Sequence, residues 1–209
     1  MFSNTSAGDL VTILVIMLIS VSVHEAMHAF AAHALGDPTA KDEGRLTLNP
    51  FKHIDFLTTV LLPVILIAIG LPPIFIAKPV PFDPDRVRFE EFGAALVALA
   101  GPFTNLALAI FTAILFRLGG NSWNPEVAEV LFLATHINVA LFVFNMIPFP
   151  PLDGSRLLYA FAPEPVQRVM YAIESMGLIF IIVIFLLLAQ VILPVVGNVT
   201  EAIRTFLLF

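Results

Sequence analysis

Two histidines and a glutamate form a short motif within the first apolar stretch of the sequence. They are His24, Glu25 and His28, in the order His-Glu-Ala-Met-His. Because four residues turn an α-helix through about 400°, both imidazoles lie on one face, about 40° apart, and reach one cation. Glu25 lies about 100° round from His24, close enough to hold a metal-bound water without being a ligand. The pattern predicts a catalytic metal centre; a buried polar cluster that only joins helices is the structural alternative.

A catalytic zinc site takes three ligands from the protein, so a third residue must join the two histidines. The sequence contains no cysteine, which leaves the carboxylates and three further histidines, His33, His53 and His136. Asp153 is distinctive because it follows the apolar run Val127–Ile147 after three helix-stopping prolines. Unwound backbone at membrane depth is tolerated only inside protein or beside a watery cavity. The alternative is that Asp153 caps a helix that begins near Ser155.

Three motifs, taken together in this order, resemble those of the site-2 protease family of intramembrane zinc metalloproteases. They are His24 to His28, the Ala-Gly-Pro-Phe-Thr-Asn segment from Ala100 to Asn105, and the segment from Asn145 to Gly154. The resemblance extends from about Val11 to Leu158 and is to the compact prokaryotic branch that lacks extra soluble domains.

The resemblance implies roles for individual residues and a function. It implies that His24, His28 and Asp153 bind one Zn²⁺ per chain and that Glu25 is the general base. It also implies that Asn105 and Asn145 line the site, near the substrate backbone or the developing oxyanion. The expected reaction is hydrolysis of peptide bonds in or near transmembrane segments of membrane-protein substrates, as in regulated intramembrane proteolysis. His33 and His136 are interpreted as packing or interfacial groups, and the role of His53 stays open.

The composition places these residues in a membrane. Of the 209 residues, 59% are hydrophobic and 12% charged, and the mean hydropathy is +0.96; a soluble domain carries about 25% charged residues. Four runs are long enough to cross a bilayer as helices: Leu10–Leu35, Phe92–Leu118, Val127–Ile147 and Ile173–Val196. The first lacks the positive flank of a cleavable signal peptide. We expect one all-α, multi-pass domain over residues 1–209, in the cell membrane and in contact with lipid.

A fifth apolar run and two extended segments are predicted to surround the site. Pro63 and the Gly70 to Pro73 break interrupt Phe56–Ala77, which favours a re-entrant helix over Phe56–Ile69 rather than a full crossing. Alternation over Gly44–Leu48 indicates a short strand, and Lys78–Phe82 is a second extended candidate. A β-hairpin or small sheet would expose an edge, at Gly44, Leu46 and Leu48, that holds an unwound substrate by β-augmentation.

The position of the motifs also constrains the topology. For Asp153 to meet His24 and His28, the first helix and Val127–Ile147 must run in the same direction, as the re-entrant arrangement permits. Eight of the ten basic residues then lie on the active-site side, opposite Arg117 and Arg204. The positive-inside rule therefore predicts an active site nearer the cytoplasm.

Other classes of function fit the sequence less well. Lys and Arg are never clustered, so no nucleic-acid partner is expected. A metal transporter would use paired repeats with matching broken helices, which the sequence lacks, and would leave Glu25 without a role. A purely structural membrane subunit would leave all three motifs unexplained. The oligomeric state is not predicted.

Overall fold

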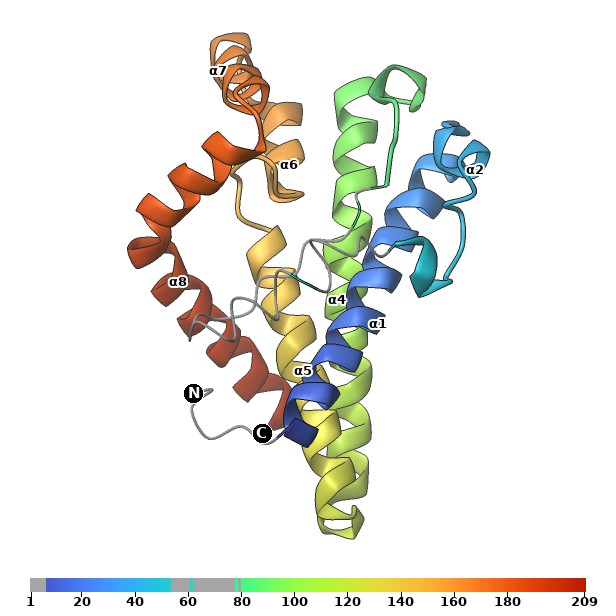
Figure 1. Cartoon of the computed structure of the whole chain (residues 1–209), viewed down its shortest axis with the longest axis vertical. Coiled ribbons are helices and arrows are strands. Elements are labelled where there is room, and N and C mark those ends of the chain that lie inside the picture. Colours follow the sequence, from blue (N-terminus) through green and yellow to red (C-terminus); the bar gives the residue numbers. More distant parts are fainter. Residues whose placement is uncertain (1–6, 54–60, 62–77, 79) are drawn as a thin grey trace.

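The computed structural model describes residues 7–53, 61, 78 and 80–209, and it is a bundle of helices (Figure 1). The four long helices are α1 (Ala7–Ala34), α4 (Glu90–Gly119), α5 (Pro125–Asn145) and α8 (Leu178–Leu208). The short helices are α2 (Thr39–Asp42), α6 (Gly154–Phe161) and α7 (Glu164–Ser175), with 3₁₀ turns η2 (Pro50–Lys52), η4 (Pro84–Arg86) and η5 (Gly120–Ser122).

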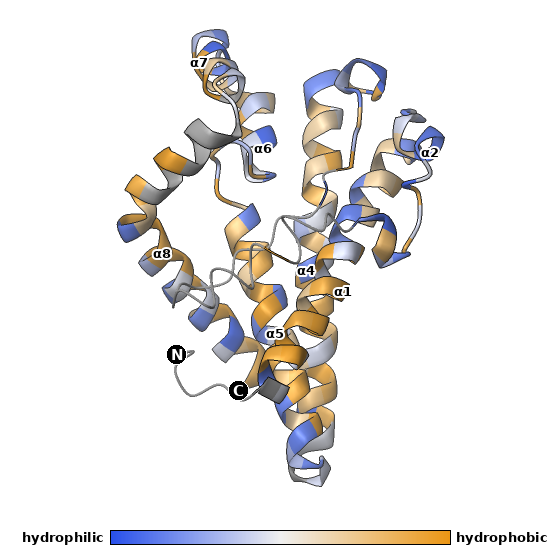
Figure 2. Ribbon diagram, in the orientation of Figure 1, coloured by the Kyte–Doolittle hydropathy of each residue, from blue (hydrophilic) through white to orange (hydrophobic). Residues whose placement is uncertain are grey.

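Four helices in the described part of the chain are long and apolar enough to cross a membrane: Gly8–Ala34, Glu90–Gly119, Pro125–Asn145 and Leu187–Leu208. Figure 2 shows mostly hydrophobic residues along α1, α4 and α5 and polar residues on α2 and α7, at one end of the bundle. The all-α, multi-pass arrangement with four long spans is therefore as predicted.

The fourth span begins and ends later in the chain than Ile173–Val196, the range predicted from hydropathy. Gly177, with φ of +86°, separates α7 from α8 in a conformation that favours glycine. At the other end, α8 continues through polar residues to Leu208. Among these, Thr200 is buried and Arg204 pairs with Glu201 and lies over the Phe132 ring of α5. Packing of these polar side chains against the bundle keeps the end of the helix formed, which a hydropathy window does not register.

Helix α4 is the centre of the bundle and contacts α1, α5, α6 and α8. Its buried face is made mostly of small residues, among them Ala94, Ala98, Gly101 and Ala109. The facing residues of α1 include Ala32, which is fully buried and packs with Val97 of α4. Small side chains let helix backbones approach closely in a membrane. The polar side chains on these helices are thereby brought within hydrogen-bonding distance of one another.

Helices α1 and α5 run in the same direction and α4 runs opposite to them (Figure 1). The backbone N–H of Arg88 donates to the Leu35 carbonyl at 2.9 Å, so the end of α1 lies beside the start of α4. The connection between them therefore begins and ends at the same end of the bundle. The predicted re-entrant helix Phe56–Ile69 falls outside the described residues.

The predicted strand over Gly44–Leu48 is wrong, and the described residues contain no β-strand. Gly44, with φ of +66°, follows α2, and the Arg45 N–H donates to the Ala40 carbonyl. The Thr47 N–H then donates to the Arg45 carbonyl two residues back. These local bonds form a turn in place of a strand. The alternation of apolar residues over Gly44–Leu48 therefore does not correspond to a strand, and the strand edge expected at Gly44, Leu46 and Leu48 is not formed.

Candidate metal centre

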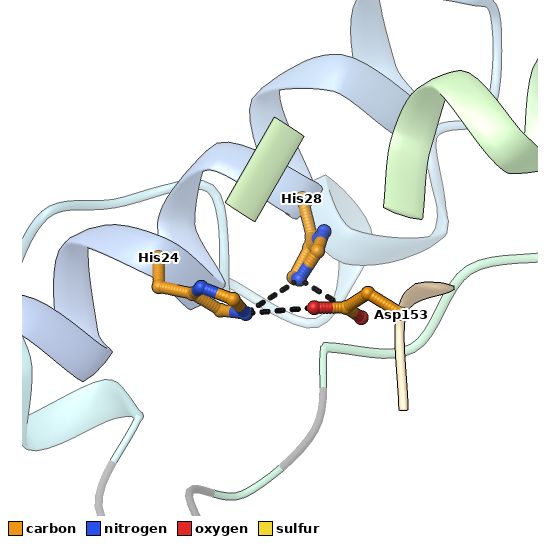
Figure 3. Close-up of side chains that lie close together, drawn as sticks. All are labelled: His24, His28 and Asp153. Atoms are coloured by element: carbon orange, nitrogen blue, oxygen red, sulfur yellow. Dashed lines mark hydrogen bonds and ion pairs between the residues drawn. The ribbon is translucent and has the colours of Figure 1, made fainter. Parts of the chain in front are cut away.

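Three side chains from two distant parts of the sequence converge at one point in the bundle (Figure 3). His24 and His28 lie one turn apart on α1, and their Nε2 atoms are 3.0 Å apart. An Asp153 carboxylate oxygen lies 3.1 Å from the Nε2 of His24, and the other lies 3.5 Å from that of His28. Both histidines are buried, and the Asp153 side chain is 21% exposed.

The spacing of these atoms fits a tetrahedral cation. Zinc bonds of about 2.0–2.2 Å to nitrogen and oxygen separate neighbouring ligand atoms by roughly 3.3 Å. The observed separations of 3.0, 3.1 and 3.5 Å are close to this value. The donor set of two imidazoles and one carboxylate is also one that catalytic zinc sites use. His24, His28 and Asp153 are therefore suited to hold one Zn²⁺ and leave a fourth position open.

The His24 ring is oriented by a residue of α4. Its Nδ1 lies 2.6 Å from the Oδ1 of Asn105, which is fully buried. An amide oxygen only accepts, so His24 Nδ1 carries the proton and donates it. In a neutral ring Nε2 then keeps its lone pair, the form that binds a metal.

The His28 ring is fixed in the same way by the backbone of α4. Its Nδ1 donates to the Val97 carbonyl at 2.8 Å, which leaves Nε2 with its lone pair. Gly101, one turn further along α4, lies directly against both rings. A Cβ at Gly101 would lie 2.5 Å from the Nε2 of His28 and 2.6 Å from the His24 ring. Only glycine at this position leaves room for the histidine pair.

Asp153 lies on the non-helical segment between α5 and α6. It occupies the position before α6 but makes no capping hydrogen bond with its side chain. The side chain points instead toward the histidines (Figure 3). The turn that presents it depends on close approach at Gly154, where a Cβ would lie 2.4 Å from the Met146 carbonyl oxygen. The capping alternative for Asp153 is therefore excluded.

Glu25 is half-buried and is held by a segment that follows the fifth apolar run. Its Oε2 accepts a hydrogen bond from the backbone N–H of Val80 at 3.0 Å. Proline carries no N–H, so within Pro79-Val80-Pro81 this is the single backbone donor. The Val80 side chain packs with Ala29 and Ala40, and this packing fixes the position of the segment along α1.

The same segment is anchored on either side of Val80. Before it, the Lys78 carbonyl accepts from Arg45 Nη2 at 2.6 Å, and the Lys78 N–H donates to the His53 carbonyl at 3.1 Å. After it, the Asp83 N–H donates to a carboxylate oxygen of the fully buried Asp37 at 2.7 Å. Burial by itself would raise the pKa of Asp37, but hydrogen bonds from Thr39 and Asp83 and the charge of Arg86 hold it below its ordinary value. Asp37 is therefore a charged anchor for the segment.

Relatives of known classification share most of the chain. YwhC of Bacillus subtilis (strain 168), a candidate zinc metalloprotease, is 33% identical over 180 residues, which are 83% of this chain and 79% of YwhC. The chain belongs to peptidase family M50, the site-2 protease family. The model of this family matches residues 116–189. As a member of the family, the chain is a zinc metallopeptidase.

Two further relatives extend the comparison. Rip2 of Mycobacterium tuberculosis (strain ATCC 25618 / H37Rv), also a candidate zinc metalloprotease, is 33% identical over 184 residues, 86% of this chain and 68% of Rip2. MJ0611 of Methanocaldococcus jannaschii, described in the same way, is 40% identical over 78 residues, 35% of this chain and 37% of MJ0611. No solved structure matches the chain.

The other residues singled out from the sequence of this M50 peptidase make hydrogen bonds within the described part of the chain. Asn145, the last residue of α5, donates through Nδ2 to the Leu141 carbonyl of its own helix at 3.0 Å. Asn105 contacts His24 but is fully buried, and its Nδ2 donates to the Oδ1 of Asn138 on α5 at 3.0 Å. His53 is buried, and its Nε2 lies 2.8 Å from the Thr47 carbonyl, so it joins the turn after α2 to the Lys78 segment.

The sequence analysis did not identify three residues around the histidines: Gly101, which lies against both rings, Asn138, which accepts from Asn105, and Ser20, which accepts from Asn138. Gly101 lay inside a recognised motif, but its contact with the histidines depends on how α1 and α4 pack. Ser20 precedes His24 by four residues, and Asn138 precedes Asn145 by seven, so each shares a helix face with a predicted site residue. Polar residues at helical spacing from the ligands are the signal that would have found them.

Proposed function

We propose that this M50 peptidase hydrolyses peptide bonds within or beside transmembrane segments of membrane proteins, as in regulated intramembrane proteolysis. The observation that carries the proposal is the convergence of His24, His28 and Asp153 inside a bundle of membrane-length helices. We infer that a site among such helices receives a substrate that is itself in the bilayer. Membrane-protein segments are therefore the expected substrates, and lipid is the expected surroundings.

In the proposed mechanism, His24, His28 and Asp153 hold the zinc and Glu25 moves the proton. When bound, zinc supplies Lewis-acid chemistry, since it acidifies water and polarises a carbonyl. The Glu25 carboxylate takes the proton from the attacking water and passes it to the leaving amine. A hydrogen bond from the Val80 N–H to Oε2 holds this carboxylate in place. Asn145, at the end of α5, is proposed to contact the opened substrate backbone.

Asn105 is proposed to act on His24 rather than on the substrate. Its Oδ1 is used by His24, its Nδ2 is used by Asn138, and its side chain is fully buried. A substrate therefore has no access to its polar atoms. The asparagine would maintain the ligand geometry, which is the role that outer hydrogen-bond partners of metal-bound histidines commonly have.

The zinc site is proposed to lie nearer the cytoplasmic face, with Phe56–Ile69 as a re-entrant helix. Eight of the ten basic residues belong to segments at the end of the bundle where α1 ends. Arg117 and Arg204 lie near the C-terminal ends of α4 and α8, toward the other end of the bundle. The positive-inside rule assigns the richer end to the cytoplasm. Single cysteines at Lys52→Cys, Lys78→Cys and Arg156→Cys should all react from the cytoplasmic side. Labelling of Lys52→Cys and Lys78→Cys from opposite sides would contradict this topology.

The experiment that tests the proposed function is cleavage of single-span substrates by the purified chain in lipid bicelles. We expect cleavage within or beside the span, loss of cleavage with a zinc chelator, and recovery when zinc is added back. The same substrates embedded in bicelles without enzyme control for spontaneous hydrolysis. Cleavage that persists at full rate after complete removal of zinc would overturn the proposal, as would cleavage confined to soluble tails far from the span.

A further inference from the structure

A chain of hydrogen bonds crosses the bundle beside the metal site and joins α1, α4 and α5. From Asn105, Nδ2 donates to the Oδ1 of Asn138 at 3.0 Å. From Asn138, Nδ2 donates to the Ser20 hydroxyl at 3.0 Å and to the Ala134 carbonyl at 2.9 Å. Ser20, Asn105 and Asn138 are all at most 3% exposed. This series of hydrogen bonds therefore runs through the protein interior from α5 to the His24 ring.

This series of hydrogen bonds has a defined direction because it starts from a group that can only accept. The Ala134 carbonyl can only accept, so the NH₂ end of the Asn138 amide, and not its Oδ1, faces it. The Oδ1 of Asn138 then faces Asn105 and fixes that amide with its NH₂ toward α5 and its Oδ1 toward His24. An acceptor facing His24 Nδ1 requires the proton on Nδ1. Each link thus determines the next, as far as the lone pair on Nε2.

We propose that Asn138 is a positioning residue that fixes the metal-binding tautomer of His24 by way of Asn105. This inference rests on the proposed function, in which His24 Nε2 binds zinc. Without Asn138, the Asn105 amide keeps only a 3.4 Å contact from Nδ2 to the Ser20 carbonyl, which is too long to hold it firmly. The amide then rotates and presents Nδ2 to His24. The His24 ring then adopts the tautomer with its proton on Nε2, and this proton blocks metal binding.

A neighbouring hydrogen bond connects α4 and α5 without any contact to a proposed ligand, and it serves as a comparison. Thr135 is also fully buried on α5, and its hydroxyl lies 2.9 Å from that of Thr112 on α4. Hydroxyls rotate and both donate and accept, so this pair transmits no preferred direction. It also has no connection to His24. Thr135→Val is therefore a matched control for the loss of one buried α4–α5 hydrogen bond.

The first test compares zinc affinity in Asn138→Leu and Thr135→Val, with the full chain in detergent and a competing chromophoric chelator. Asn138→Leu should weaken zinc binding about tenfold, as loss of an outer hydrogen-bond partner does. Thr135→Val should leave the affinity within about twofold, although both variants lower the unfolding temperature. Equal zinc affinity in Asn138→Leu and wild type would overturn the proposal, and so would an equal loss in both variants.

The second test is a rescue that a merely structural role would not produce. Asp in place of Asn105 presents an acceptor to His24 whichever way its carboxylate turns, as in carboxylate–histidine–zinc arrangements. Asn105→Asp should therefore restore zinc affinity in the Asn138→Leu background, whereas Asn105→Leu should add no more than about a twofold loss. A folded Asn105→Asp/Asn138→Leu protein that binds zinc as weakly as Asn138→Leu would contradict the proposal.

These readouts separate the inference from the proposed function. Zinc affinity is measured without substrate, so failure of the rescue with chelator-sensitive cleavage intact overturns only the role of Asn138. Cleavage that does not depend on zinc in the wild-type chain overturns the proposed function, whatever the asparagine variants do.

Discussion

His24, His28 and Glu25 belong to one short segment of α1, yet the histidines and the glutamate are held in different ways. The histidine rings are fixed by Asn105 and by the Val97 carbonyl, both on the long helix α4. The Glu25 carboxylate is bonded to the Val80 N–H, on a segment outside the long helices. We infer that the geometry of the histidine ligands depends on packing of the long helices. The position of Glu25, the proposed base, depends instead on the segment that contains Val80. Substitutions should therefore separate zinc binding from turnover.

The largest expected effect is on the ligand side, at Asp153. Asp153→Ala removes one of three proposed ligands and leaves the histidine pair without its charge-balancing partner. Zinc affinity should fall at least about 100-fold, and cleavage should fall with it. Zinc titration of the purified variant measures the loss. Asp42→Ala, an exposed aspartate on α2, is the control and should bind zinc normally; equal affinity in the two variants would refute Asp153 as a ligand.

The next effect is at Gly101, where the histidine side meets the bundle. Gly101→Ala adds a Cβ within 2.5–2.6 Å of both rings, so the ligand pair must move. We expect zinc affinity about tenfold weaker and a stability loss of about 1–3 kcal/mol from overpacking. Gly197→Ala is a matched control on α8, because its Cβ would meet nothing within 4 Å. If Gly101→Ala bound zinc as well as Gly197→Ala, the histidine geometry would not depend on this contact.

A smaller and more selective effect is expected on the Glu25 side. Val80→Pro removes the N–H that bonds to Glu25, while Val80→Ala keeps the N–H and loses only side-chain packing. We expect kcat about tenfold lower in Val80→Pro than in Val80→Ala, which is less than the loss of a whole general base. Zinc content and KM should be alike in the two variants. A parallel loss of zinc would mean that the two sides of the site are not independent.

The smallest effect concerns the anchor of the segment at Asp37. Because the folded-state pKa of this buried carboxylate is lowered, its stabilising effect is complete above the unfolded pKa of about 4 and is lost as the pH falls through the folded pKa. The unfolding temperature of the wild type should therefore drop more steeply below about pH 4 than that of Asp37→Asn. At pH 7, Asp37→Asn should be less stable by about 1–3 kcal/mol. Parallel pH curves for the two proteins would contradict a charged anchor.

The parts of the molecule that follow from local pattern were predictable, and those that follow from packing were not. Membrane-length apolar runs gave α1, α4 and α5, and helical spacing placed His24 and His28 together. Gly44–Leu48 was mistaken for a strand because alternation does not distinguish a strand from a turn whose donors bond locally. The C-terminal end of α8 and the contacts of Gly101 and Asn138 depend on neighbouring helices, which no single segment specifies.

The most direct measurement of the central claim compares zinc content and cleavage rate in Glu25→Gln and the wild type. Glutamine keeps the shape of the side chain and an oxygen to accept the Val80 N–H, but it cannot take a proton from water. We predict one zinc per chain in both proteins and loss of cleavage in Glu25→Gln alone. Turnover by zinc-loaded Glu25→Gln at a rate close to wild type would show that Glu25 is not the base, and loss of zinc would show that it is part of the ligand set.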